Sequence, residues 1–231
     1  MCCTIKCVDA IYQRQLARLN YVEPADLLRE VMPAVVAILQ RPETVSHLSD
    51  REKGALLQKH QAGFLAMMTK RIAKGTNVEV SVAYAEGADY DCVLRGIAPG
   101  MPVAYKPVQL KQLPSHETNA GATLQGLVEG LKRKYPTSTD LIAGIWINRD
   151  VNLVFDELDF TGLHIEQLWF FGDATSGEVT LDGGFVSDLI NGLRWWSVLD
   201  GPDLRGGQVR FRPLPRSSPE GNGVSGCAAR A

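Results

Sequence analysis

The fold of this chain is decided by the stretch Asn77–Leu113, which reads NVEVSVAYAEGADYDCVLRGIAPGMPVAYKPVQLKQL. Apolar residues alternate with polar or small ones over 78–84, which predicts a half-buried strand. Two turn signals, Glu86-Gly87-Ala88 and Ala98-Pro99-Gly100, divide the remainder. We therefore expect a second strand over 91–96, antiparallel to the first, and a third strand over 103–113.

The third strand is expected to carry polar side chains on one face. Because side chains alternate along a strand, Gln109 and Lys111 share one face, and Val108 and Leu110 share the other. Pro107 removes a ladder donor, so a bulge or a late strand start is expected there. Asp91 opens the second strand, which brings an acid, an amide and an amine onto neighbouring strands.

Helices and a further strand flank this meander. Ser49 and Glu52 form the pattern of a capping box, which starts a helix that continues to about Lys74. Apolar spacing predicts a second helix that begins near Leu124 and ends near Tyr135. The apolar run 141–147 predicts a buried strand, and a right-handed crossover places it parallel to the third strand. The fold class is therefore α/β, or more closely α+β.

The two ends of the chain add further elements. Helices are expected over 5–19 and 24–40, the second kinked or restarted at Pro33. Strands are expected over 165–171 and 178–181, and a closing helix over 186–196. We divide the chain into an N-terminal helical arm (1–48), a core with a C-terminal extension (49–200), and a tail (201–231) that is disordered from about 213.

Composition narrows the class of protein. The chain has 231 residues, a net charge of -2 and 45% hydrophobic residues, which is typical of a soluble globular protein and excludes a highly basic nucleic-acid coat. It has no apolar run long enough for a membrane span and no signal peptide, so a cytoplasmic location is expected. Five cysteines form neither a disulfide framework nor a zinc motif, and Cys92 is expected as a small core residue.

The order helix, three-stranded meander, helix, strand, with Asp91 and Gln109-x-Lys111 at these places, resembles the PD-(D/E)XK nuclease-like superfamily over residues 49–148. The resemblance implies a restriction-endonuclease-like core. It implies an aspartate at the start of the second core strand, Gln-x-Lys as a variant of Glu-x-Lys on the third, and a further Glu or Gln from the first core helix.

The predicted chemistry is metal-dependent hydrolysis of phosphodiester bonds, in DNA rather than RNA. Asp91 and Gln109 would hold Mg²⁺ or Mn²⁺ through oxygen atoms, and Lys111 would orient the attacking water and stabilise charge on the phosphate. Further candidates around this site are Gln58, Gln61, Asp89 and His116. The basic run Lys132-Arg133-Lys134 is a candidate contact to a nucleic-acid backbone, although basic residues at a helix C-terminus also suit the helix dipole.

Other interpretations stay open at this point. Asp91 can be a turn residue that bonds its own backbone, and Gln109 and Lys111 can form a solvated strand face. The neutral Gln109 also suits a non-catalytic module that binds nucleic acid or a protein partner. Finally, Trp169-Phe170-Phe171 and Trp195-Trp196 can serve base stacking, core packing or a homo-oligomer interface.

Overall fold

A computed structural model of the chain describes residues 12–40, 42–85, 89–173, 193–198 and 208–211. The N-terminal part is helical over 12–17. The elements that follow, in chain order, are α2 (Pro24–Gln40), the 3₁₀ helix η1 (Pro42–Val45), α3 (Asp50–Ile72), β1 (Glu79–Tyr84), β2 (Cys92–Ile97), β3 (Ala104–Leu113), α4 (Leu124–Lys134), β4 (Ile142–Ile147), β5 (Val151–Val154), the 3₁₀ helix η2 (Phe155–Glu157), β6 (Gln167–Asp173), β7 (Leu193–Val198) and β8 (Gln208–Phe211).

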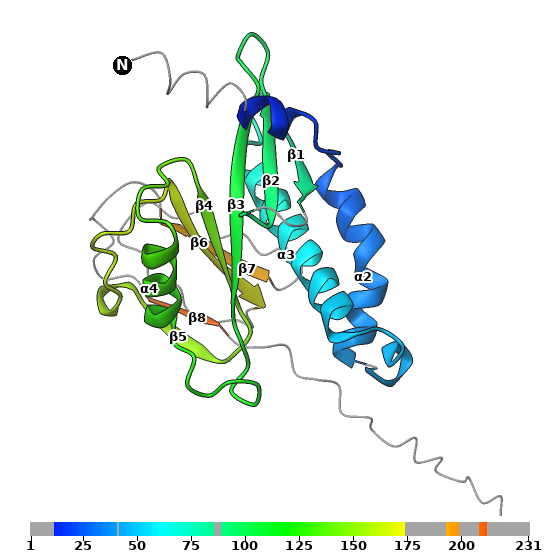
Figure 1. Cartoon of the computed structure of the whole chain (residues 1–231), viewed down its shortest axis with the longest axis vertical. Coiled ribbons are helices and arrows are strands. Elements are labelled where there is room, and N and C mark those ends of the chain that lie inside the picture. Colours follow the sequence, from blue (N-terminus) through cyan, green and yellow to red (C-terminus); the bar gives the residue numbers. More distant parts are fainter. Residues whose placement is uncertain (1–11, 41, 86–88, 174–192, 199–207, 212–231) are drawn as a thin grey trace, which may run out of the picture.

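A six-stranded mixed sheet organises the described residues, in the order β1-β2-β3-β4-β6-β7 (Figure 1). The strands β1, β2 and β3 form an antiparallel meander, and β4 is parallel to both β3 and β6. The mixed α/β class, the meander and the parallel pairing of β3 with β4 are therefore confirmed. The remaining strands, β5 and β8, pair antiparallel in a separate two-stranded sheet.

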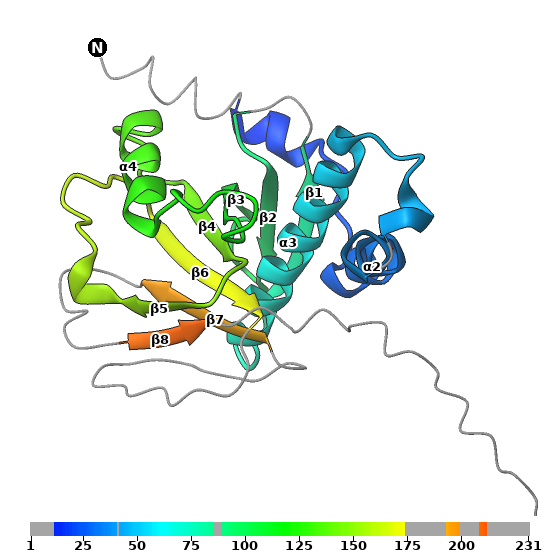
Figure 2. The ribbon, with the colours of Figure 1, turned by 90° about the horizontal axis from the view of Figure 1, so that it is seen from below.

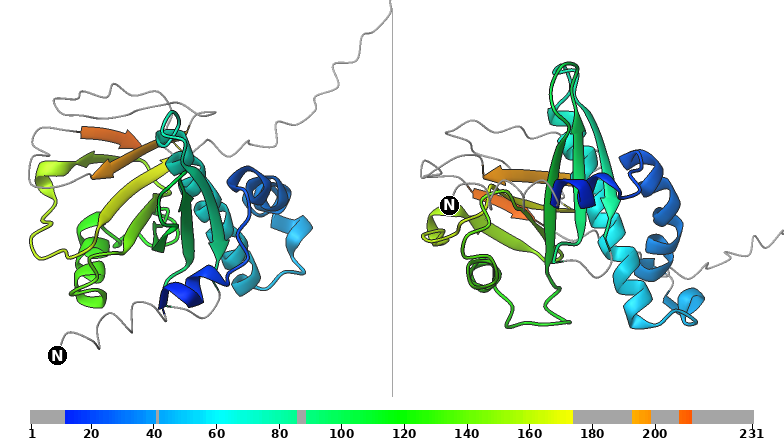
Figure 3. Two further views of the ribbon diagram at one scale, coloured as in Figure 1. Left: turned by 90° about the horizontal axis from the view of Figure 1, so that it is seen from above. Right: turned by 45° about the horizontal axis from the view of Figure 1, so that its top comes forward.

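Helices cover the sheet on both faces (Figures 2 and 3). On one face α3 lies against the sheet and α2 lies outside α3; their core joins Leu65 and Ala66 to Val108, Leu110 and Trp146. On the other face α4 and the β5–η2 segment pack over a second core that contains Leu131, Ile145 and Phe170. Trp169, Phe170 and Phe171 are at most 3% exposed, so these three aromatic residues serve core packing, as does the buried Cys92.

The start of α3 follows the capping pattern of the sequence. The Ser49 hydroxyl accepts a hydrogen bond from the Glu52 amide, and the Glu52 carboxylate accepts one from the Ser49 amide at 2.8 Å. The predicted capping box is thus confirmed, and with it the residue at which α3 begins.

Two expectations about proline are wrong: a restart of the helix at Pro33, and a bulge or late strand start at Pro107. The helix α2 runs from Pro24 to Gln40 without a restart at Pro33. Pro107 lies inside β3, where the register to β2 continues unbroken. The Val108 oxygen accepts from the Asp91 amide, so the backbone of Val108 faces β2 and that of Pro107 faces the opposite edge. At that edge β4 pairs with β3 only from Val108 onward. The hydrogen bonds between these two strands therefore do not need the amide hydrogen that Pro107 lacks.

The C-terminal predictions need a further correction. Residues 193–196, predicted as the end of a helix, belong to β7, which pairs antiparallel with β6. Aromatic residues favour a strand where a sheet edge offers partners, and periodicity over a short apolar run does not separate the two structures. The strand β8 falls within the range assigned to the tail, whereas 1–11, 178–181, 186–192 and 212–231 lie outside the described residues.

Within the described ranges, no helix combines the length and the apolar character that crossing a membrane requires.

Candidate functional site

The carboxylate of Asp91 lies in the plane of the sheet, just before β2 begins. The backbone amide of Leu110 points toward the β2 side of β3 and donates to Asp91 Oδ2 at 2.6 Å. The ladder between β2 and β3 starts only at Cys92, so the carboxylate takes the place of the next β2 residue. Asp91 therefore satisfies a backbone donor that the end of the ladder leaves unpaired.

Gln109 holds Asp91 from the α4 side of the sheet. It is only 4% exposed, and its Nε2 donates to Asp91 Oδ2 and, at 3.2 Å, to the Leu110 carbonyl. Its Oε1 accepts from Lys134 Nζ at 3.0 Å and from the Tyr135 hydroxyl. The opposite amide orientation would set oxygen against the carboxylate and NH₂ against the ammonium, so these neighbours fix the orientation. The side-chain oxygen of Gln109, which was predicted to bind a metal, therefore points toward α4 instead.

Lys111 follows Gln109 on the same face of β3 and is half-buried. Burial lowers the pKa of its ammonium, and Lys134 lowers it further, while Asp91 acts in the opposite direction. Burial likewise raises the pKa of Asp91, against the Leu110 hydrogen bond and the charges of Lys111 and Lys134. The acid, the amide and both amines therefore form one electrostatically coupled group.

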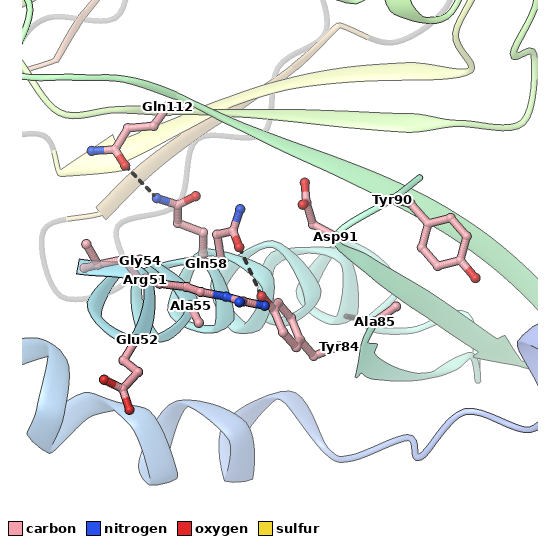
Figure 4. Close-up of a pocket in the computed structure, with 12 residues that line it drawn as sticks. Arg51, Glu52, Gly54, Ala55, Gln58, Tyr84, Ala85, Tyr90, Asp91 and Gln112 are labelled. Atoms are coloured by element: carbon pink, nitrogen blue, oxygen red, sulfur yellow. Dashed lines mark hydrogen bonds between the residues drawn. The ribbon is translucent and has the colours of Figure 1, made fainter. Parts of the chain in front are cut away.

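A pocket of about 690 Å³ opens on the other side of Asp91, between α3 and the sheet (Figure 4). Gln58 and Gln61 line it from α3, and Tyr84 and Gln112 line it from β1 and β3. The Tyr84 hydroxyl donates to Gln58 Oε1 at 3.0 Å, and Gln61 Nε2 donates to Gln112 Oε1 at 3.4 Å. The full lining is Arg51, Glu52, Gly54, Ala55, Leu57, Gln58, Gln61, Tyr84, Ala85, Tyr90, Asp91 and Gln112.

The predicted residues therefore fall into two groups that meet at Asp91. Gln109 and Lys111 lie on the α4 face, and Gln58 and Gln61 lie in the pocket on the α3 face. Asp89 contributes its backbone carbonyl, which lies 2.7 Å from the Tyr135 hydroxyl and shares its one hydrogen with Gln109 Oε1, while the Asp89 side chain is exposed.

His116 and most of the basic run lie apart from this group. His116 lines a second pocket of about 390 Å³ with the buried Arg149, whose Nη1 is 3.5 Å from His116 Nδ1. Lys132 is paired with Glu129 at 2.7 Å and with Asp159 at 3.5 Å, and Arg133 is exposed. Lys134 alone of this run belongs to the site, because its Nζ donates to Gln109 of β3.

Among the side chains that form hydrogen bonds in the site, sequence reasoning missed three: Tyr84, Gln112 and Tyr135. The signal for Gln112 was present, because alternation along β3 puts it on the α3 face with Val108 and Leu110. The contacts of Tyr135 and Lys134 with Gln109 depend on how α4 packs against β3. This packing cannot be predicted from the local sequence pattern.

A divalent metal fits Asp91 better than it fits the predicted pair. Asp91 Oδ2 accepts two hydrogen bonds, whereas Oδ1 accepts none from the described residues. Among those same residues, no three His, Cys, Asp or Glu side chains gather where they could hold a metal. Magnesium needs only one or two protein carboxylates when substrate phosphate and water complete its shell, so Asp91 Oδ1 suits it and the engaged Gln109 oxygen does not.

The chain matches no protein-family model, no curated protein and no solved structure.

Proposed function

We propose that the protein is a metal-dependent nuclease of the PD-(D/E)XK type, with a restriction-endonuclease-like core, that hydrolyses phosphodiester bonds in DNA. The observation that carries the proposal is the direct contact of Asp91 with Gln109, beside Lys111, at the wall of a polar pocket. These three side chains come from neighbouring strands in the order that the resemblance implies.

Asp91 Oδ1 would hold Mg²⁺ or Mn²⁺. The bound ion would neutralise phosphate charge and lower the pKa of a coordinated water. In this proposal Gln109 is a positioning residue, because its amide NH₂ bonds Oδ2, while Oδ1 accepts no hydrogen bond from the described residues. Lys134 and Tyr135 in turn fix the amide of Gln109.

Lys111 would handle the proton of the attacking water. Burial and the neighbouring Lys134 lower the pKa of Lys111, so its amine gives up its own proton more readily than a solvated lysine does. The neutral amine can accept a proton from water, and the protonated form can stabilise charge that develops on the phosphate.

The test is nicking of supercoiled plasmid by the full chain with Mg²⁺ or Mn²⁺. We expect cleavage that stops in EDTA, and a rate reduced about 100-fold or more in Asp91→Asn and in Lys111→Met, since each removes a group that the reaction needs. Asp89→Asn is the matched control, because its side chain is exposed and only its backbone takes part in the site. Wild-type rates in Asp91→Asn would contradict the proposal.

One observation favours a second candidate, a nuclease-like module that binds nucleic acid without cutting it. Among the described residues, Asp91 is the one carboxylate that contacts Gln109, and the position of the usual glutamate holds this neutral and fully engaged residue. This candidate predicts salt-sensitive DNA binding without metal-dependent nicking, and unchanged binding in Lys111→Arg, which keeps the charge. Self-association through Trp195-Trp196 stays a separate prediction, which light scattering would check.

A further inference from the structure

Three glutamine side chains give the pocket beside Asp91 an unusual chemistry. Gln58 and Gln61 come from α3, and Gln112 comes from β3. Figure 4 shows Gln58, Gln112 and Asp91 around the space between α3 and β3, while Glu52 turns away toward its cap. Glutamine is therefore the commonest polar residue of the lining, beside the charged Arg51, Glu52 and Asp91.

The amides are only partly satisfied by the protein. Gln61 is 5% exposed, yet its carbonyl oxygen accepts no hydrogen bond from the described residues, and its single bond, to Gln112, is long at 3.4 Å. The NH₂ groups of Gln58 and Gln112 likewise donate to none of the described residues. A buried polar atom without a partner is costly, so the Gln61 oxygen needs a donor from a ligand or water. The half-buried Gln58 and Gln112 add unused NH₂ donors to the same pocket.

The place of the pocket limits the class of ligand. In the proposed reaction, Asp91 lies at the phosphodiester that is cut, so the substrate group that reaches the pocket is the adjoining nucleoside. Nucleobase edges present donors and acceptors side by side, and glutamine amides pair with them in two-bond geometry. A volume of about 690 Å³ is ample for one nucleoside.

We propose that this amide pocket receives one unstacked nucleobase next to the cleaved phosphodiester, which makes single-stranded nucleic acid the preferred substrate. Inside a duplex, a base has its pairing edge occupied and cannot enter a pocket without first leaving the stack. The inference rests on the proposed nuclease function and narrows its substrate from DNA in general to strands with unpaired bases.

The experiment measures binding of fluorescein-labelled single-stranded and duplex DNA of the same sequence to the full chain in EDTA. We expect tighter binding of the single strand. Gln61→Met and Gln112→Met keep the side-chain length but remove the hydrogen bonds, so each should weaken single-strand binding about tenfold. The loss should be the same at low and high salt, because neutral amides release no counterions.

Gln40→Met is the matched control, since this exposed glutamine ends α2 away from the pocket, and binding should change by less than about twofold. Thermal melting checks that the buried Gln61→Met variant folds, and the half-buried Gln112→Met tests the pocket independently. Unchanged single-strand binding in a folded Gln61→Met and in Gln112→Met would overturn the inference and indicate that only water fills the pocket. Equal losses on the duplex would overturn it as well.

The two proposals fail in different ways. Metal-dependent nicking with no effect of the glutamine variants would leave the nuclease standing and remove the base pocket. Single-strand binding that depends on Gln61 and Gln112, without any nicking, would support the base pocket and remove the nuclease.

Discussion

Asp91 has two opposite effects on the stability of the fold. It accepts hydrogen bonds from the Leu110 amide and from Gln109, which satisfies donors at the start of β2. As a charged group it loses hydration, and this burial raises its pKa more than the nearby amines lower it. A carboxylate kept in such a place for structure alone would cost stability, which is the pattern expected of a site that trades stability for function.

Asp91→Asn should therefore make the protein more stable at neutral pH. The asparagine oxygen can still accept from Leu110 and Gln109, while the buried charge is gone. Because the folded-state pKa of Asp91 is raised, its ionisation destabilises the native state as pH rises through that pKa. The gain in melting temperature should be present at neutral pH and vanish in acid, where both side chains are neutral.

The measurement is the melting temperature of the wild type and of Asp91→Asn at a series of pH values from neutral to acid. Asp140→Asn is a control, since Asp140 is exposed and should give no comparable gain. A less stable Asp91→Asn at neutral pH would mean that the charge stabilises the fold on balance, through Lys111 and Lys134.

At the scale of elements, β4 packs closely because one of its residues has no side chain. A Cβ on Gly144 would lie 2.9 Å from Phe171 Cε1, 3.1 Å from Leu110 Cδ2 and 3.5 Å from Leu65 Cδ2. Gly144 thus lets β3, β6 and α3 meet over the middle of the sheet. A methyl group there would overpack the core, because these neighbours would have to shift to admit it.

Gly144→Ala should destabilise the protein by about 1–3 kcal/mol, because the added methyl forces its neighbours to shift. The same substitution at Gly130, in α4, should stabilise by up to about 1 kcal/mol, because alanine favours helix and no atom lies within 4 Å of the new Cβ. Urea unfolding of both variants measures the two values. Changes of the same sign would contradict this account of the packing.

Local sequence pattern is sufficient to predict three elements of the fold. The capping box at Ser49, the alternation in β1 and the apolar run of β4 each contain their own physical cause, and all three elements form as expected. The β5–β8 pairing joins segments far apart in the chain, and residues 193–196 become a strand because β6 offers an edge. Neither outcome is contained in a local window.

The same distinction applies to the candidate site. Alternation along β3 was enough to bring Gln109 next to Asp91. The direction of the Gln109 amide was not predictable, because Lys134 and Tyr135 determine it from the end of α4. Local pattern therefore predicted which residues meet, whereas tertiary packing decides which of their atoms remain available for chemistry.

On the scale of the whole molecule, stability depends on how the helical layer joins the sheet, and a histidine lies at that junction. His60 of α3 is 8% exposed, and its ring centre lies 4.6 Å from that of Phe64 and 5.6 Å from that of Trp146 in β4. Burial lowers the pKa of His60 from 6.5 to about 4. The native state therefore holds this imidazole neutral over a range in which the unfolded chain protonates it.

This difference predicts a loss of stability in mild acid. Since the folded-state pKa is the lower one, the stabilisation is complete above pH 6.5 and falls as pH decreases toward 4, by about 3 kcal/mol in total. His60→Phe keeps an aromatic ring between Phe64 and Trp146 but cannot be protonated, so its free energy of unfolding should decline less over this range. The exposed His47→Gln should follow the wild-type curve. Parallel pH profiles for the wild type and His60→Phe, measured by urea unfolding, would show instead that acid acts through the carboxylates and not through the junction between α3 and the sheet.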